Sequence, residues 1–264
     1  MSKKALVLGA TGHTGRSLTR ELLRGSLYSQ ISIVVRKNLS SEQQNELFQA
    51  EEESKKLDQI VVPDFSQLQE SIAPVISQFN SIFCCLGSSI QQHGVEASRK
   101  IDRDTPLLVA RLAMNINNSN NTEQSSTTTT TPTKPLLSHF SIITSISSDP
   151  NSSNIYLKIK GEVERDLTSL NIPRLTIFRP AGIIGRQEPI HESIAKSIMG
   201  GLRWLRLIPG SIANLHAEDI GKALAFVDNK YFMNEKKEDS KPEVVLLKVV
   251  DIQSIVDEMN QVQK

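Results

Sequence analysis

The sequence predicts an α/β fold built on a doubly wound parallel sheet. Three observations predict it. Short apolar runs alternate with longer amphipathic segments, a glycine-rich turn follows the first apolar run, and 264 residues are enough for one sizeable core. Strands that alternate with helices form parallel sheets, because each helix carries the chain back to the start of the next strand. We therefore expect residues 1–264 to form a single domain.

Seven short apolar runs have the length and composition of strands. They are residues 5–8, 31–35, 60–62, 82–86, 140–144, 175–178 and 244–250. Five further segments carry apolar residues near the 3.6-residue period of a helix. These are residues 12–23, 67–78, 102–114, 154–170 and 252–262.

Two polar stretches interrupt this alternation. Residues 115–134 contain almost no apolar side chains, so burial cannot offset the entropy cost of ordering them, and we expect a disordered surface insertion. It contains two glycosylation acceptor triplets, which we expect to be unused because the chain shows no secretory signal. The charged run at 234–243 is expected to be a solvated loop.

Charge and cysteine content limit the binding partners and the cellular compartment that we expect for the protein. The chain has 30 basic and 29 acidic residues, which gives no general attraction to nucleic acid or to an anionic membrane. Its two cysteines, Cys84 and Cys85, are adjacent and cannot form an ordinary disulfide without severe strain. Packing is favoured over redox switching as their role. With no signal peptide and no apolar run of spanning length, we expect a cytoplasmic protein.

The glycine-rich turn lies in the sequence KALVLGATGHTGR, residues 4–16, where the first strand becomes the first helix. Gly9 suits a tight turn, Gly12 lets the backbone approach a pyrophosphate, and Gly15 lets the helix lie close to the strand. The free N–H groups and positive dipole end of the helix would stabilise the phosphate charge. No lysine follows the third glycine, which argues against a magnesium-binding P-loop. The turn predicts a dinucleotide site.

The cofactor is predicted to be NADP rather than NAD. An NAD-binding chain usually has an acidic residue at the end of the second strand, where it holds the ribose 2′-hydroxyl. Here Arg36 and Lys37 occupy that place. Charge-assisted hydrogen bonds to a 2′-phosphate contribute about 1.5 to 3 kcal/mol, enough for a tenfold preference or more.

Three residues are candidates for catalysis. Tyr156 and Lys160 are four apart and share one face of the predicted helix 154–170, so both can point into one pocket. A protonated lysine favours the phenolate, which lets the pair exchange a proton with a substrate carbonyl near neutral pH. Lys160 could also bond the nicotinamide ribose. Ser145 ends the strand at 140–144, at the sheet edge where such folds bind ligands.

With these residues the chain resembles the short-chain dehydrogenases/reductases. The resemblance rests on GATGHTG, Ser145, Tyr156-x-x-x-Lys160 and Phe178-Arg179-Pro180. A closer resemblance is to the HIV Tat-interactive protein 2 oxidoreductase group. It rests on LGATGHTGR, on CCLG at 84–87, on Asp102-Arg103-Asp104, and on Tyr156-Leu157 followed by KGEVE at 160–164. It covers most of residues 4–188 and implies a Rossmann-like fold of the short-chain dehydrogenase type.

The resemblance implies a site for NADPH and a catalytic pair, Tyr156 and Lys160. The cofactor contacts it implies are Thr11, Gly12, His13 and Thr14 at the turn, Arg36 and Lys37 at the 2′-phosphate, Leu86 and Gly87 after the fourth strand, and Ile183 at the nicotinamide. Three departures matter. His13 replaces an acidic residue, the stretch after Asn115 is extra, and the chain no longer aligns securely beyond Pro189.

Residues 189–264 are expected to form a small substrate or lid region within the same domain. The amphipathic segment 193–207 could lie on a membrane surface, but the fold needs a lobe over the cofactor cleft, which favours a lid. His216, Glu218 and Asp219 could suggest a metal site. An acidic first turn of a helix is the better interpretation, so no metal is expected.

The sequence leads to one functional hypothesis and one alternative. The first is an NADPH-dependent oxidoreductase that reduces a small carbonyl substrate, with Tyr156 as the acid, Lys160 as its activator and Ser145 orienting the carbonyl oxygen. The alternative is a regulatory or interaction protein that binds the cofactor and turns over little. The resemblance implies protein partners and favours a monomer.

Overall fold

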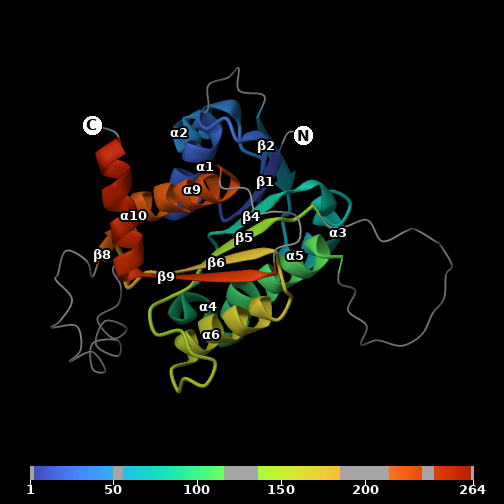
Figure 1. Cartoon of the computed structure of the whole chain (residues 1–264). Helices are drawn as coiled ribbons and strands as arrows, with labels where there is room; N and C mark the ends of the chain where they lie inside the picture. The colour runs from blue at the N-terminus through green and yellow to red at the C-terminus, as the bar shows by residue number, and fades with distance from the viewer. Residues whose placement is uncertain (1–2, 50–55, 116–135, 185–213, 234–240, 263–264) are drawn as a thin grey trace.

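The computed structural model describes residues 3–49, 56–115, 136–184, 214–233 and 241–262 (Figure 1). Its centre is a seven-stranded sheet in the order β3-β2-β1-β4-β5-β6-β9, and all neighbouring strands are parallel. The order reverses between β1 and β4, as in doubly wound folds. The predicted fold class is confirmed.

Each predicted strand is present, with small shifts at its ends. The strands of the main sheet are β1 (Lys3–Leu8), β2 (Tyr28–Val35), β3 (Leu57–Val61), β4 (Ser81–Cys84), β5 (His139–Ile143), β6 (Arg174–Arg179) and β9 (Glu243–Lys248). Two short strands, β7 (Gly182–Ile184) and β8 (Asn214–His216), form a separate parallel pair.

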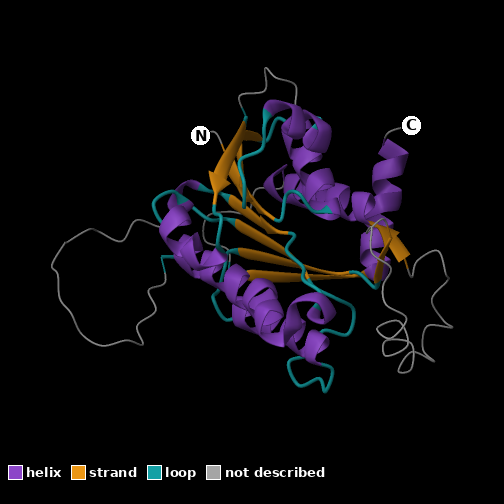
Figure 2. Cartoon of the chain, turned by 180° about the vertical axis from the view of Figure 1, so that it is seen from behind, coloured by secondary structure: helices purple, strands orange, loops and turns teal. Residues whose placement is uncertain are grey.

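Helices cover both faces of the sheet (Figures 1 and 2). One face packs against α1 (His13–Arg24), α2 (Ser41–Phe48), α9 (Ala217–Met233) and α10 (Val249–Val262). The other packs against α3 (Leu68–Ile72), α5 (Thr105–Ala113) and α6 (Ile155–Thr168). The side chains of alternate residues in a strand point to opposite faces of the sheet and pack into the two separate cores. Ala5 and Val7 belong to the first core and Leu6 and Leu8 to the second, which explains why residues 5–8 of β1 are all apolar.

The predicted helix 67–78 is wrong as a continuous element. The chain forms a 3₁₀ turn η1 (Phe65–Gln67), then α3, which ends at Ile72, and a second 3₁₀ turn η2 (Ile76–Gln78). Pro74 explains the break, because proline has no N–H to donate and its ring clashes with the carbonyl four residues earlier.

The helix predicted at 102–114 begins differently from the expectation. It is preceded by α4 (Ile90–Arg99) and by a π-helical turn η3 (Lys100–Asp104), and only then continues as α5. Helix α2 was also not predicted. Its signals are local: a capping box between Ser40 and Gln43, and one buried residue, Phe48.

The C-terminal part of the described chain belongs to the main layers. β9 extends the sheet beside β6, and α9 lies against α1 so closely that a Cβ added to Gly221 would come within 2.6 Å of the Ser17 Cβ. The role of residues 189–264 as a substrate cover stays a prediction. The amphipathic segment 193–207 and, except for Asn115, the predicted insertion lie outside the described residues, as does most of the run 234–243.

Candidate cofactor and catalytic site

The glycine turn joins the end of β1 to the start of α1. Gly9 has a φ of +77°, and a Cβ there would lie 2.9 Å from the backbone carbonyl carbon of Cys85. A Cβ at Gly15 would lie 2.1 Å from the carbonyl oxygen of Gly9. The backbone itself therefore requires glycine at both positions, with or without a ligand.

Gly12 differs from the other two glycines. It is exposed, and the nearest atom to an added Cβ would be the Gly9 carbonyl oxygen at 3.3 Å. Gly12 is also the N-cap of α1, which has neither a side-chain cap nor an acidic residue in its first turn. Thr11 beside it is exposed, His13 is half-buried and Thr14 is buried. A helix start left open in this way suits an anion such as a pyrophosphate.

The other predicted cofactor residues follow neighbouring strands at the same edge of the sheet. Leu8 pairs with Val34 of β2 and with Cys84 of β4, so the chain leaves all three strands at one level. Arg36 and Lys37 follow β2 and are exposed; Leu86 and Gly87 follow β4. Ile183 of β7 is partly buried and packs against the first core.

The structure brings the predicted catalytic residues to this edge as well. Ser145 follows β5 and is 4% exposed; its carbonyl oxygen accepts a hydrogen bond of 2.7 Å from the Ser148 hydroxyl. Asn154 caps α6 by accepting bonds from the backbone N–H groups of Tyr156 and Leu157. Lys160 lies one helical turn after Tyr156, and its Nζ is 6.0 Å from the centroid of the phenol ring.

Gly161 holds the loop after Ser145 against α6. A Cβ at Gly161 would lie 2.2 Å from both the Asp149 carbonyl carbon and the Pro150 nitrogen. The Asp149 N–H also donates to the carbonyl oxygen of Leu157 at 3.2 Å. Sequence reasoning assigned Gly161 no role; the only signal was a glycine directly after Lys160. Because Gly161 has no side chain, the loop after Ser145 can lie directly against α6.

Asp102 is the second residue to which sequence reasoning gave no role. Its carboxylate Oδ1 lies 2.9 Å from Nζ of Lys160, and the two side chains are 2% and 5% exposed. The backbone N–H and the hydroxyl of Ser88 donate to the same carboxylate. Burial alone would lower the pKa of Lys160, but the charges of Asp102 and then Tyr156 outweigh it, so the pKa is raised. Lys160 is thus held as a buried ammonium.

The two cysteines pack into the cores on opposite faces of the sheet. Cys84 belongs to the core beneath α5 and α6, and Cys85 packs against the core beneath α1 and α9. Burial raises the pKa of the Cys84 thiol to about 12, and it also raises that of Cys85. Both are therefore neutral thiols at physiological pH.

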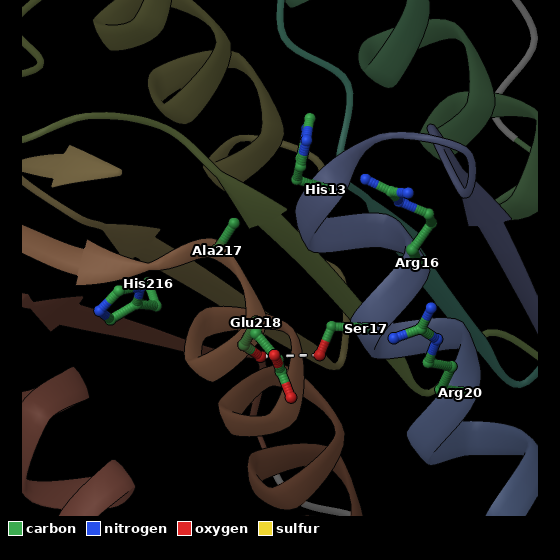
Figure 3. Close-up of a pocket in the computed structure, with 7 residues that line it drawn as sticks. All are labelled: His13, Arg16, Ser17, Arg20, His216, Ala217 and Glu218. Atoms are coloured by element: carbon green, nitrogen blue, oxygen red, sulfur yellow. Dashed lines mark hydrogen bonds between the residues drawn. The ribbon is translucent and has the colours of Figure 1, made fainter. Parts of the chain in front are cut away.

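A cavity of about 260 Å³ adjoins the glycine turn (Figure 3). It is lined by His13, Arg16, Ser17 and Arg20 from α1 and by His216, Ala217 and Glu218 at the junction of β8 and α9. Ser17 ties the two elements together, since its hydroxyl donates to the Glu218 carbonyl oxygen at 2.7 Å. Most of the charged lining is basic, which suits an anionic group more than a cation.

The predicted acidic first turn is confirmed, because Glu218 and Asp219 form the first turn of α9. His216 was also expected at the helix start, but it ends β8. Glu218 pairs with Lys222 at 2.8 Å. Within the described ranges, no group of three or more His, Cys, Asp or Glu could hold a metal ion. In the same ranges no helix has the length and apolar character needed to cross a membrane.

The fold is a Rossmann-like α/β fold of the type found in short-chain dehydrogenases/reductases and related epimerases. UDP-glucuronic acid 4-epimerase from Bacillus cereus, solved with NAD, matches 98% of this chain and 84% of its own at a TM-score of 0.60 and 12% identity. Vestitone reductase from alfalfa matches 93% of this chain and 76% of its own at a TM-score of 0.53 and 17% identity.

The chain belongs to the HTATIP2 family. Rat protein HTATIP2 is 32% identical over 203 residues, which cover 76% of this chain and 72% of that protein. Protein FMP52 of Eremothecium gossypii is 24% identical over 234 residues, 86% of this chain and 90% of that protein. No protein-family model matches the chain.

The relatives also correct one expectation. FMP52 proteins from Eremothecium gossypii, Scheffersomyces stipitis and Kluyveromyces lactis are named mitochondrial, so the expected cytoplasmic localisation is wrong. That expectation rested on the lack of a secretory signal and of an apolar run long enough to span a membrane. Neither feature distinguishes the cytosol from the inside of a mitochondrion.

Proposed function

We propose that this protein is an NADPH-dependent oxidoreductase that reduces a small carbonyl compound. The observation that carries the proposal is the position of Lys160, buried one helical turn from Tyr156 at the sheet edge where the glycine turn also lies. A buried lysine beside a tyrosine suits a proton donor whose phenolate must be stabilised.

The residues at the sheet edge fit a nicotinamide dinucleotide. The open start of α1 suits the pyrophosphate, and the exposed cations Arg36 and Lys37 suit a 2′-phosphate rather than a 2′-hydroxyl. The residues proposed to hold the cofactor are Gly9, Thr11, Gly12, His13, Thr14, Gly15, Arg36, Lys37, Leu86, Gly87, Tyr156, Lys160 and Ile183. When bound, NADPH supplies the hydride; the protein supplies position and electrostatics.

The proposed roles of the catalytic residues follow from their chemistry. The Ser145 hydroxyl donates a hydrogen bond to the substrate carbonyl oxygen and fixes its orientation. The Tyr156 hydroxyl gives its proton to the same oxygen as negative charge develops there. The Lys160 ammonium stabilises the phenolate that remains, and its raised pKa keeps it charged at neutral pH.

Tyr156→Phe tests the proposal. The change removes one hydroxyl and little volume, so NADPH affinity should survive while carbonyl reduction falls on the order of a hundredfold or more. Reduction would be followed as NADPH oxidation against a panel of aldehydes, ketones and quinones, with calorimetry of cofactor binding on the same samples. If the unmutated protein binds NADPH tightly but reduces nothing faster than the variant, the regulatory alternative replaces the enzyme.

We also infer that the protein acts in mitochondria, from the names of its FMP52 relatives. Cell fractionation with antibodies against matrix and cytosolic markers tests this. Recovery only with the cytosolic marker would refute it.

A further inference from the structure

We propose that Asp102 is a positioning residue for the catalytic pair: it holds the Lys160 ammonium in place beside Tyr156 and sets the pH range over which Lys160 keeps its proton. The inference rests on the proposed function for its link to catalysis, but not for its link to proton binding. Asp102 lies in the sequence Asp102-Arg103-Asp104, to which the family resemblance gave no role.

Asp102 binds both Lys160 and Ser88 in a buried position. The Lys160 Nζ lies 2.9 Å from Asp102 Oδ1, and both side chains are almost wholly buried. Two donors from Ser88, its N–H at 3.3 Å and its hydroxyl, fix the same carboxylate from the loop after β4. Asp102 therefore connects that loop, the η3 turn and α6 at one point.

The backbone places Asp102 there through the π-helical turn. η3 widens the helix between α4 and α5, and such single π turns are frequent at functional sites. Its two neighbours in sequence, Arg103 and Asp104, bind each other at 2.8 Å on the outer side, where the Asp104 side chain is 49% exposed. Of the two carboxylates on this turn, only Asp102 contacts Lys160 among the described contacts.

The other ionisable groups around Lys160 do not replace this charge. Tyr156 lies one turn before it, and Cys84 faces it from β4 as a neutral thiol because burial raises its pKa to about 12. Two residues further along α6, Glu162 is bound by Arg99 and Arg103. Asp102 is thus the carboxylate that balances the buried ammonium.

The sign of its effect follows from electrostatics. The negative charge of Asp102 favours the protonated form of Lys160 and raises its pKa. Lys160 will therefore lose its proton at lower pH when Asp102 is replaced by a neutral residue, and the alkaline limb of the pH–rate profile will move down. A purely structural role would lower the rate equally at every pH and leave that limb in place.

The test compares Asp102→Asn, which removes the charge and keeps the shape, with Asp102→Glu, which keeps the charge. Asp104→Asn is the matched control on the same turn. The alkaline limb of the pH profile for carbonyl reduction should move down by about one pH unit in Asp102→Asn and stay in place in the other two. An unmoved limb in folded Asp102→Asn overturns the proposal.

A second measurement needs no turnover and no cofactor. The Lys160 side chain is titrated by its ¹³Cε chemical shift in the unmutated protein and in Asp102→Asn, and Lys160→Met identifies the signal. The transition should move to lower pH in Asp102→Asn. If it moves while no carbonyl is reduced, the enzymatic function fails and the role of Asp102 stands; if it does not move, the role of Asp102 fails.

A third variant covers the case in which Asp102→Asn does not fold. Removing one partner of a buried ion pair leaves an uncompensated charge, whereas replacing both partners does not. Asp102→Asn combined with Lys160→Met should therefore be more stable in denaturant unfolding than either single variant. Simple additivity of the two changes would show that the pair is not coupled, and would overturn the proposal.

Discussion

The Nδ1 atom of His139 lies 2.6 Å from the carboxylate of Asp228, and neither side chain is exposed to solvent. The same carboxylate accepts hydrogen bonds from the hydroxyls of Tyr28 and Ser81. Asp228 comes from α9, while its three partners stand at the starts of β2, β4 and β5. This network attaches α9 to the starts of these strands, at the end of the sheet opposite the candidate site.

Asp228→Ala should destabilise the protein by about 3 kcal/mol or more, because it strands several buried polar groups at once. Urea unfolding followed by circular dichroism measures the loss. Asp257→Ala, an exposed change on α10, is the control and should be nearly neutral. A loss below about 1 kcal/mol for Asp228→Ala would show that the network contributes little.

Gly161→Ala should displace the loop after Ser145, because the new methyl would overlap the Asp149–Pro150 backbone. We expect a loss of about 1 to 3 kcal/mol in unfolding free energy and a lower rate of carbonyl reduction. Gly25→Ala is the matched control, since a Cβ there would make only an ordinary contact at 3.4 Å. Equal effects of the two changes would contradict the account of Gly161.

Arg36→Asp should reverse or erase a preference for NADPH over NADH. At low salt the unmutated protein should bind NADPH at least tenfold more tightly, because Arg36 and Lys37 meet a charge of roughly −2 on the 2′-phosphate. Calorimetric titration with each cofactor measures the ratio. Lys241→Asp makes the same charge change before β9, at the other edge of the sheet, and should leave the ratio unchanged.

Native Cys84 should resist alkylation at pH 8. With a pKa of about 12, on the order of one thiol in ten thousand is ionised at that pH, and the side chain is 1% exposed. Mass spectrometry after iodoacetamide treatment should show Cys84 modified only once the chain is unfolded. Rapid labelling of the folded protein would mean that β4 opens on the time scale of the reaction.

Elements with a periodic or continuous apolar pattern were predictable from the sequence. Elements that depend on a single contact were not. β1 and β2 are apolar on both faces because helices cover both, which leaves a clear signal over residues 5–8 and 31–35. α2 has one buried residue and little periodicity. Pro74 is a sequence signal for a helix break, but apolar residues at helical spacing on both sides of it favoured one continuous helix in the prediction.

The candidate site shows the same division. Glycine spacing and the four-residue interval from Tyr156 to Lys160 are short-range patterns, so the sequence reveals them. Asp102 reaches Lys160 across 58 residues of chain through a π-helical turn, and Gly161 contacts a loop whose path no local pattern specifies. Contacts of this kind depend on packing, which a single sequence does not display.

The contacts of the three glycines also bear on how relatives should be compared. Gly9 and Gly15 are required by the crossing of β1, α1 and the Cys85 backbone, so a descendant that had abandoned its cofactor would still retain both. Gly12 is exposed, and the one atom that an added Cβ would meet is the Gly9 carbonyl oxygen at 3.3 Å, a far milder constraint. Substitution at position 12, accompanied by loss of the cations at 36 and 37, would therefore identify family members that had given up nucleotide chemistry while keeping the architecture.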